Sequence, residues 1–147
     1  NPDQREFYTA NRNQDLHRWS LDDDGTRAAR DTTQTFFAAL ASKDYQAAAA
    51  LFTLSEYDLP QAKEWGLDKD LPGYLEKFCE AEAALCLPVH RVLPGGGQMW
   101  QDEYVVFVEF ENPDGSVYVM PDYGSTLYVL LAPGEDRKLR VNFIPLQ

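Results

Sequence analysis

Alanine and valine occupy different halves of this chain. Fourteen of the fifteen alanines lie at or before Ala84, whereas all nine valines and the only isoleucine lie at or after Val89. Alanine favours helix, and β-branched residues favour strand. The chain therefore predicts a helical first half and a sheet in the second half. Since no linker, repeat or low-complexity tract separates the halves, we expect one α+β domain.

The first half carries three predicted helices. The clearest covers residues 26–41, and its apolar residues recur at helical spacing: Ala29, Thr33, Phe36, Phe37 and Leu40. The second covers residues 45–52, with Asp44 as its capping residue. The third follows Asp70 and has Pro72 in its first turn. We expect all three to pack on the sheet.

Residues 1–25 precede the domain, which we place at 26–147. They include the apolar side chains of Phe7, Tyr8, Leu16 and Trp19, which indicate a helix-like segment that packs onto another surface. The chain begins at Asn1 rather than at a methionine. A removed signal or anchor segment explains that start, and so does a trimmed boundary.

Turn signals punctuate the second half at residues 94–97, 112–115, 121–124 and 133–136. They separate five candidate strands, at residues 88–93, 102–111, 116–120, 125–132 and 137–144. Short turns imply antiparallel pairing. The second and fourth candidates carry apolar residues on both faces, so both faces of the sheet are expected to be covered. The helices cover one face; the other needs the N-terminal segment or a second copy of the chain, which would be a homodimer formed through the sheet.

The glycine run at residues 95–97 has no following Lys-Ser or Lys-Thr, so it predicts a flexible hairpin tip rather than a phosphate-binding loop. Such a tip would hold Met99 and Trp100 at its end. Exposed, these two side chains would form a knob that binds a partner. Folded back, they would cap a cavity.

The charge balance excludes one class of partner. The chain has 13 basic and 24 acidic residues, a formal net charge of −11. An acidic chain repels phosphate backbones, so nucleic acid is not expected to bind. No apolar run approaches the roughly 20 residues that span a bilayer, so no transmembrane segment is expected.

No metal site or cofactor is expected. Two cysteines without a nearby histidine pair make no zinc site. The spacing of Asp22, Asp24 and Asp31 echoes a calcium loop, but Ser20 stands where the first aspartate belongs. Capping of the helix at 26–41 explains the same acids.

Cys79 and Cys86 are the only cysteines. Seven residues along a continuous helix would separate them by about 10.5 Å, whereas a disulfide needs Cα atoms within roughly 6.8 Å. A bridge would form only if the helix ends or bends before Cys86, which Pro88 makes conceivable. The spacing therefore favours buried free thiols.

Residues 28–52, AARDTTQTFFAALASKDYQAAAALF, resemble the opening of the nuclear transport factor 2-like superfamily. Its members begin with a long helix ending in Phe-Phe-x-Ala-Leu, then a small-polar-Asp turn and a helix of the form Tyr-x-x-Ala-x-x-Leu-Phe. The resemblance covers residues 26–144. It implies a curved antiparallel sheet that closes with the helices into a cone around a cavity.

The resemblance leaves the function open. Some members are ketosteroid isomerases, scytalone dehydratases, polyketide cyclases or epoxide hydrolases. Others bind ligands or partner chains, and many are exported or lipid-anchored, so we expect a secreted or cell-envelope protein. No catalytic motif of the enzymes aligns with this chain. We expect a non-catalytic domain that binds a small apolar ligand or a partner; the alternative is a small isomerase, cyclase or dehydratase that uses acid/base chemistry.

The sequence offers candidate residues for catalysis and for a ligand cavity. His90, on the first predicted strand, could act as a general base beside an acid, although a surface histidine fits the same position. Asp122 and Tyr123 share a turn and could polarise a carbonyl group. The side chains expected to line a ligand cavity are Tyr104, Tyr118, Tyr128 and Trp100.

Overall fold

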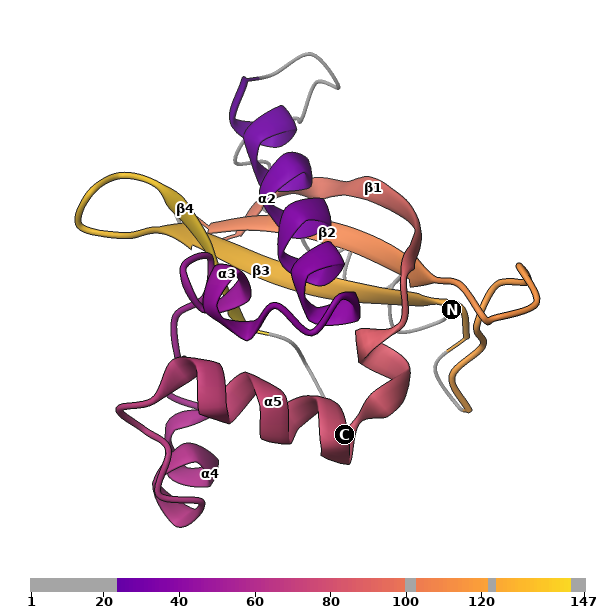
Figure 1. Ribbon diagram of the computed structural model, residues 1–147. Coiled ribbons are helices and arrows are strands. Elements are labelled where there is room, and N and C mark those ends of the chain that lie inside the picture. Colours follow the sequence, from indigo (N-terminus) through magenta and orange to yellow (C-terminus); the bar gives the residue numbers. More distant parts are fainter. Residues whose placement is uncertain (1–23, 100–102, 122–123, 144–147) are drawn as a thin grey trace.

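The computed structural model describes residues 24–99, 103–121 and 124–143. Helices come first, and four antiparallel strands follow in the order β1-β2-β3-β4, which confirms the α+β class (Figure 1). The elements are α2 (Asp24–Ala41), α3 (Tyr45–Ala49), α4 (Leu59–Glu64), α5 (Leu71–Ala81), the 3-10 turn η1 (Ala83–Cys86), β1 (Val89–Met99), β2 (Glu103–Phe110), β3 (Thr126–Pro133) and β4 (Leu139–Phe143). Among these residues, no helix has both the length and the apolar character that a membrane crossing requires.

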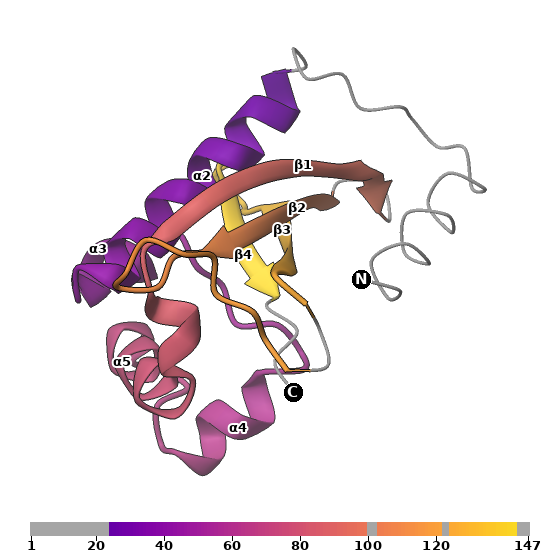
Figure 2. The ribbon, with the colours of Figure 1, turned by 90° about the vertical axis from the view of Figure 1, so that its right-hand side faces the viewer.

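The helices lie on one face of the sheet, and α2 runs obliquely across it in contact with β1, β2 and β4 (Figures 1 and 2). The predicted stripe of α2 is confirmed, because all five of its residues are buried. Phe37 meets Phe110 of β2 edge to face, with ring centroids 5.2 Å apart. Phe36 stacks on Phe52 at 5.7 Å. The core thus lies between α2 and the sheet.

Two aspartates cap helices: Asp44, whose cap the sequence predicts, and Asp70, which the sequence places just before the third helix. The Asp44 carboxylate accepts a hydrogen bond from the Ala47 backbone N–H, and Asp70 accepts one from Gly73 at 3.0 Å. A Cβ at Gly73 would lie 2.5 Å from an Asp70 carboxylate oxygen, so a larger residue there would make the capping carboxylate shift.

Helix α3 ends at Ala49, earlier than the predicted residue 52. The reason is a contact with the sheet edge. The Val141 N–H donates to the Leu51 carbonyl at 2.8 Å, and the Thr53 N–H donates to the Val141 carbonyl at 2.9 Å. The Leu51 carbonyl and the Thr53 N–H are therefore paired with β4 and do not continue the helix.

Helix α4 was not predicted. Its start is organised by Ser55, whose hydroxyl donates to the Asp58 carboxylate at 2.9 Å and accepts from the Asp58 N–H at 3.2 Å. Pro60 then occupies the first turn. A Ser-x-x-Asp group ahead of proline was the signal available in the sequence.

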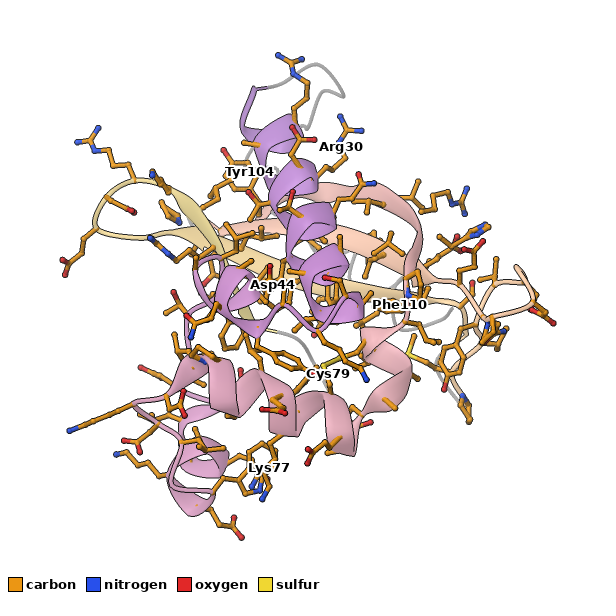
Figure 3. All side chains as sticks on the ribbon, viewed as in Figure 1. Arg30, Asp44, Lys77, Cys79, Tyr104 and Phe110 are labelled. Atoms are coloured by element: carbon orange, nitrogen blue, oxygen red, sulfur yellow. A yellow bond between two sulfur atoms is a disulfide. The ribbon has the colours of Figure 1, made fainter. Side chains whose placement is uncertain are left out.

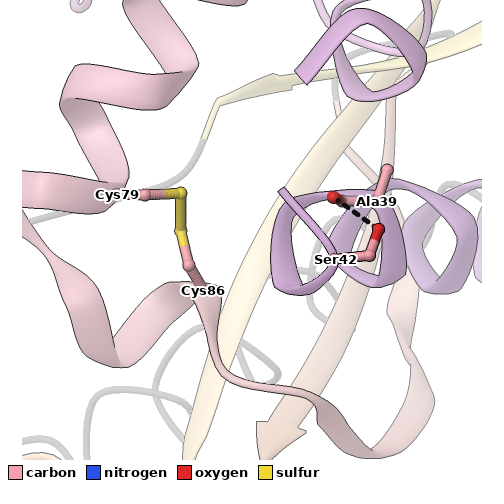
Figure 4. Close-up of a disulfide and its surroundings, with 4 residues drawn as sticks. All are labelled: Ala39, Ser42, Cys79 and Cys86. Atoms are coloured by element: carbon pink, nitrogen blue, oxygen red, sulfur yellow. Dashed lines mark hydrogen bonds between the residues drawn. A yellow bond between two sulfur atoms is a disulfide. The ribbon is translucent and has the colours of Figure 1, made fainter. Parts of the chain in front are cut away.

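The prediction of free thiols is wrong: Cys79 and Cys86 form a disulfide, with Cα atoms 5.7 Å apart (Figure 4). Helix α5 ends at Ala81, and Glu82 leaves the helical conformation at φ −126° and ψ 62°. The chain then turns back through η1. This early helix end is the condition under which the spacing allowed a bridge.

The observed sheet differs in two places from the sheet predicted from the sequence. The glycine run at residues 95–97 is not a hairpin tip, because β1 continues through it to Met99, and the register shifts between Pro94 and Gln98. Glycines tolerate such an irregularity within a strand. Residues 116–120 form no strand in the described sheet; they make only isolated bridges, from Val117 to Glu111 and from Met120 to Gly124.

Asp70→Ala is expected to lower the free energy of unfolding by about 1 kcal/mol, because the first turn of α5 loses its side-chain acceptor. Asp70→Asn keeps an acceptor and serves as the matched control, with most of the stability retained. Urea denaturation followed by circular dichroism measures both variants. Equal losses in the two would contradict the cap.

Loss of the disulfide is expected to destabilise the fold by about 2.5 kcal/mol, through the larger conformational freedom of the uncrosslinked unfolded chain. The comparison is urea denaturation of the native chain with and without reductant. The double variant Cys79→Ser/Cys86→Ser should match the reduced chain and ignore the reductant. A native chain equally indifferent to reductant would contradict the bridge.

Candidate functional site

His90 lies on the edge strand β1, next to an acid. Its Nδ1 is 3.7 Å from Oε1 of Glu111, and the two side chains are 36% and 40% exposed. The pair therefore sits at the surface of the sheet edge. The other proposed catalytic residues, Asp122 and Tyr123, lie outside the described residues, as does Trp100.

The three cavity tyrosines do not share one face of the sheet. Tyr104, labelled in Figure 3, packs against the core that lies under the helices, and Tyr118 packs against the same core. Tyr128 packs against a separate cluster, made only of strand residues, on the opposite face. The three tyrosines therefore do not line a single pocket.

A buried tyrosine that the sequence did not single out lies on α5. The Tyr74 ring stacks on Phe52 at 6.1 Å and contacts Trp65 at 5.5 Å. Burial, with a smaller contribution from the nearby Asp58 charge, raises the pKa of Tyr74 to about 12. Burial also raises the pKa of Asp58, against the hydrogen bonds from Ser55. Because Tyr74 is enclosed by core rings, it serves the packing of α5.

A groove of about 390 Å³ lies beside the disulfide. It is formed where the end of α2, the following turn and the start of α3 face α5 and η1 (Figures 3 and 4). Its lining residues are Leu40, Ala41, Lys43, Tyr45, Glu76, Cys79, Glu80, Ala83 and Cys86.

Both walls of this groove are held by local bonds. On the α2 side, Lys43 adopts a left-handed conformation at φ 64°, and the Ser42 hydroxyl donates to the Ala39 carbonyl at 3.1 Å (Figure 4). On the other side, the disulfide joins α5 to η1. The groove is therefore a preformed feature of the fold.

The groove combines an apolar lining with charged side chains. The disulfide, Leu40 and the two alanines are apolar. Glu76 and Glu80 stand four residues apart on α5, so they share one side of that helix. Lys43 comes from the facing turn. This arrangement suits a ligand with an apolar body and a charged end.

The face of the sheet away from the helices, here called the outer face, has an apolar centre. It consists of Leu93, Val105, Phe107, Tyr128 and Leu130. One end is closed by Glu109, which is buried and accepts hydrogen bonds from Arg91 Nε at 2.9 Å and from the Ser125 hydroxyl at 3.2 Å.

Glu103 lies at the other end of the same row on β2. Burial raises the pKa of its carboxyl group, and a hydrogen bond from Asn142 lowers it in part. Its Oε2 is buried without a hydrogen-bond partner in the described structure. The outer face is thus an apolar strip with a carboxylate at each end.

Of the acids that echo a calcium loop, Asp22 lies outside the described residues. Asp24 begins helix α2, and Asp31 lies within it. Within residues 24–99, 103–121 and 124–143, no three histidine, cysteine, aspartate or glutamate side chains come together as a metal site would require.

Glu103→Gln is expected to raise the urea midpoint at pH 7 and to leave it unchanged at pH 3.5. The folded chain holds a proton on Glu103 over a pH window in which the unfolded chain has released it, so stability falls as pH rises through that window. Glutamine does not ionise, so it removes the free-energy cost of a buried carboxylate. Its side-chain oxygen still accepts the hydrogen bond from Asn142. The control is Glu135→Gln, in the exposed β3–β4 turn, and an equal gain there would contradict the explanation.

No protein-family model matches this chain, and a search of curated proteins also finds no match. The resemblance to the nuclear transport factor 2-like superfamily therefore stays a prediction.

Proposed function

We propose that this protein is a non-catalytic binding domain of the nuclear transport factor 2-like cone fold. Its ligand is a small amphipathic cation, which binds in the groove beside the Cys79–Cys86 disulfide. The observation that carries this proposal is a preformed hollow whose lining combines apolar side chains with two glutamates on one wall.

The order and packing of the elements support the cone fold. A long helix, a short capped helix and the later helix α5 precede an antiparallel sheet, as in that superfamily, and the short helix α4 is an addition between α3 and α5. The residues that carry the resemblance are packing residues here as well. Phe36, Phe37, Leu40, Ala48 and Phe52 are all buried.

The size and charge of the groove support a small cationic ligand. A volume of about 390 Å³ is near the lower end of the range for small-molecule sites. The apolar lining offers contact area for a hydrocarbon or aromatic body. Glu76 and Glu80 offer carboxylates to an amine and outnumber the one cation in the groove lining, Lys43. The net charge of −11 raises the local concentration of cations.

The enzyme alternative has one supporting observation, the approach of Glu111 to His90. Acid/base catalysis needs two polar groups that converge on a substrate in an enclosed site. This pair lies at the exposed edge of β1 and lines no part of the groove. Binding is therefore the function that the geometry supports best.

A pair of fragments of similar size tests the sign of the ligand charge. In NMR titrations, 2-phenylethylamine is expected to shift the backbone amide signals of the groove residues, and 3-phenylpropanoate is not. Glu80→Gln should weaken binding of the amine about two- to fivefold, as for loss of one exposed ion pair.

Glu64→Gln is the matched control, because Glu64 is an exposed glutamate of α4 outside the groove. It should leave binding of the amine unchanged. Equal shifts with the amine and the acid would overturn the role of Glu76 and Glu80. An absence of shifts with either fragment would overturn the groove as the binding site.

A further inference from the structure

Three charged side chains line the groove, and they are not neutralised by one another. Glu76 and Glu80 come from α5, and Lys43 comes from the turn after α2. All three are exposed, and none of them makes a side-chain hydrogen bond or an ion pair with another described residue. Both signs of charge are therefore available to a ligand.

Lys43 occupies a backbone position that glycine usually fills. Its φ is 64°, in the left-handed region. The Lys43 N–H donates to the Leu40 carbonyl at 3.1 Å, and the Asp44 N–H donates to the Ala39 carbonyl at 2.8 Å. This is a Schellman motif, whose left-handed residue is usually glycine because glycine has no Cβ. A lysine there is strained, and residues held in strained conformations cluster at functional sites.

The end of α2 does not require the ammonium group of Lys43 as a cap. The carbonyls of residues 38–40 already accept hydrogen bonds from backbone N–H groups. A lysine near the end of a helix gains some stability from the helix dipole. That gain is the same in ordinary helical geometry, so it does not explain a lysine at the left-handed position.

We propose that Lys43 binds a carboxylate of the ligand, and that the ligand is a basic amino acid of the lysine type. This inference rests on the proposed function and adds to it the chemical class of the ligand. Two carboxylates and one ammonium group in the lining are complementary to two cationic groups and one carboxylate. A molecule with these groups still carries one net positive charge.

The rest of the lining suits the same ligand. The hydrocarbon stem of a basic amino acid would contact Leu40 and the disulfide between the charged walls. The groove volume of about 390 Å³ leaves room for a molecule of this size.

The variant Lys43→Gly separates recognition of the carboxylate from the general effect of charge. NMR titrations compare free lysine with cadaverine, which is lysine without its carboxylate. Loss of a positive charge from the groove should tighten binding of any cation that contacts only the glutamates. Cadaverine is therefore expected to bind the variant at least as tightly as the native chain. Free lysine is expected to bind about two- to fivefold more weakly, as for loss of one exposed ion pair.

Three controls accompany this comparison. Glycine accepts the left-handed conformation, so Lys43→Gly should keep the far-UV circular dichroism spectrum and a urea midpoint at least as high as the native chain. Lys43→Arg keeps the charge and should bind free lysine as the native chain does. Lys69→Gly removes the same charge at an exposed turn outside the groove and should leave both affinities unchanged.

Free lysine that binds Lys43→Gly as tightly as the native chain, or more tightly, would overturn the role of Lys43 and leave the cation groove in place. An equal loss for cadaverine would also overturn that role, because the substitution would then have weakened the groove for every amine. A native chain whose groove amides shift with cadaverine but not with free lysine would overturn the ligand class. Failure of cadaverine and 2-phenylethylamine to shift any groove amide would instead overturn the proposed function, and this inference with it.

Discussion

The edge-to-face contact of Phe37 with Phe110 joins the two halves of the molecule. It holds α2 on β2, and α3 contacts both α2 and α5. Phe36, the neighbour of Phe37, stacks on Phe52, and Phe52 stacks in turn on Tyr74 of α5. This chain of rings explains why a helical half and a sheet half with such different compositions form one core.

The sequence anticipated the features that depend on local spacing. The apolar stripe of α2 and the cap at Asp44 follow from periodicity and side-chain chemistry, and the structure confirms them. It did not anticipate the length of α3, because that helix is ended by hydrogen bonds to β4, some ninety residues later in the chain. Long-range backbone pairing leaves no mark on a short stretch of sequence.

In the candidate site, too, local features were predictable from the sequence and long-range contacts were not. The cysteine spacing raised the possibility of a bridge but could not locate the end of α5, which decides whether the sulfurs meet. The groove beside the bridge depends on how α2, α5 and η1 approach one another. Residues such as Lys43 and Glu80 were therefore invisible as a pair. The apolar character of both sheet faces was visible, since strand alternation alone shows it.

The short bridge between residues 51–53 and Val141 has a consequence for association. An edge strand with free backbone groups invites the edge of another molecule, and this is a common route to aggregation. At β4 the Val141 N–H and carbonyl are already occupied by the chain itself. At β1, the pairing register with β2 shifts between Val89 and Arg91 and again between Pro94 and Gln98, so this strand is irregular. Copies of this protein are thus hindered from extending the sheet sideways.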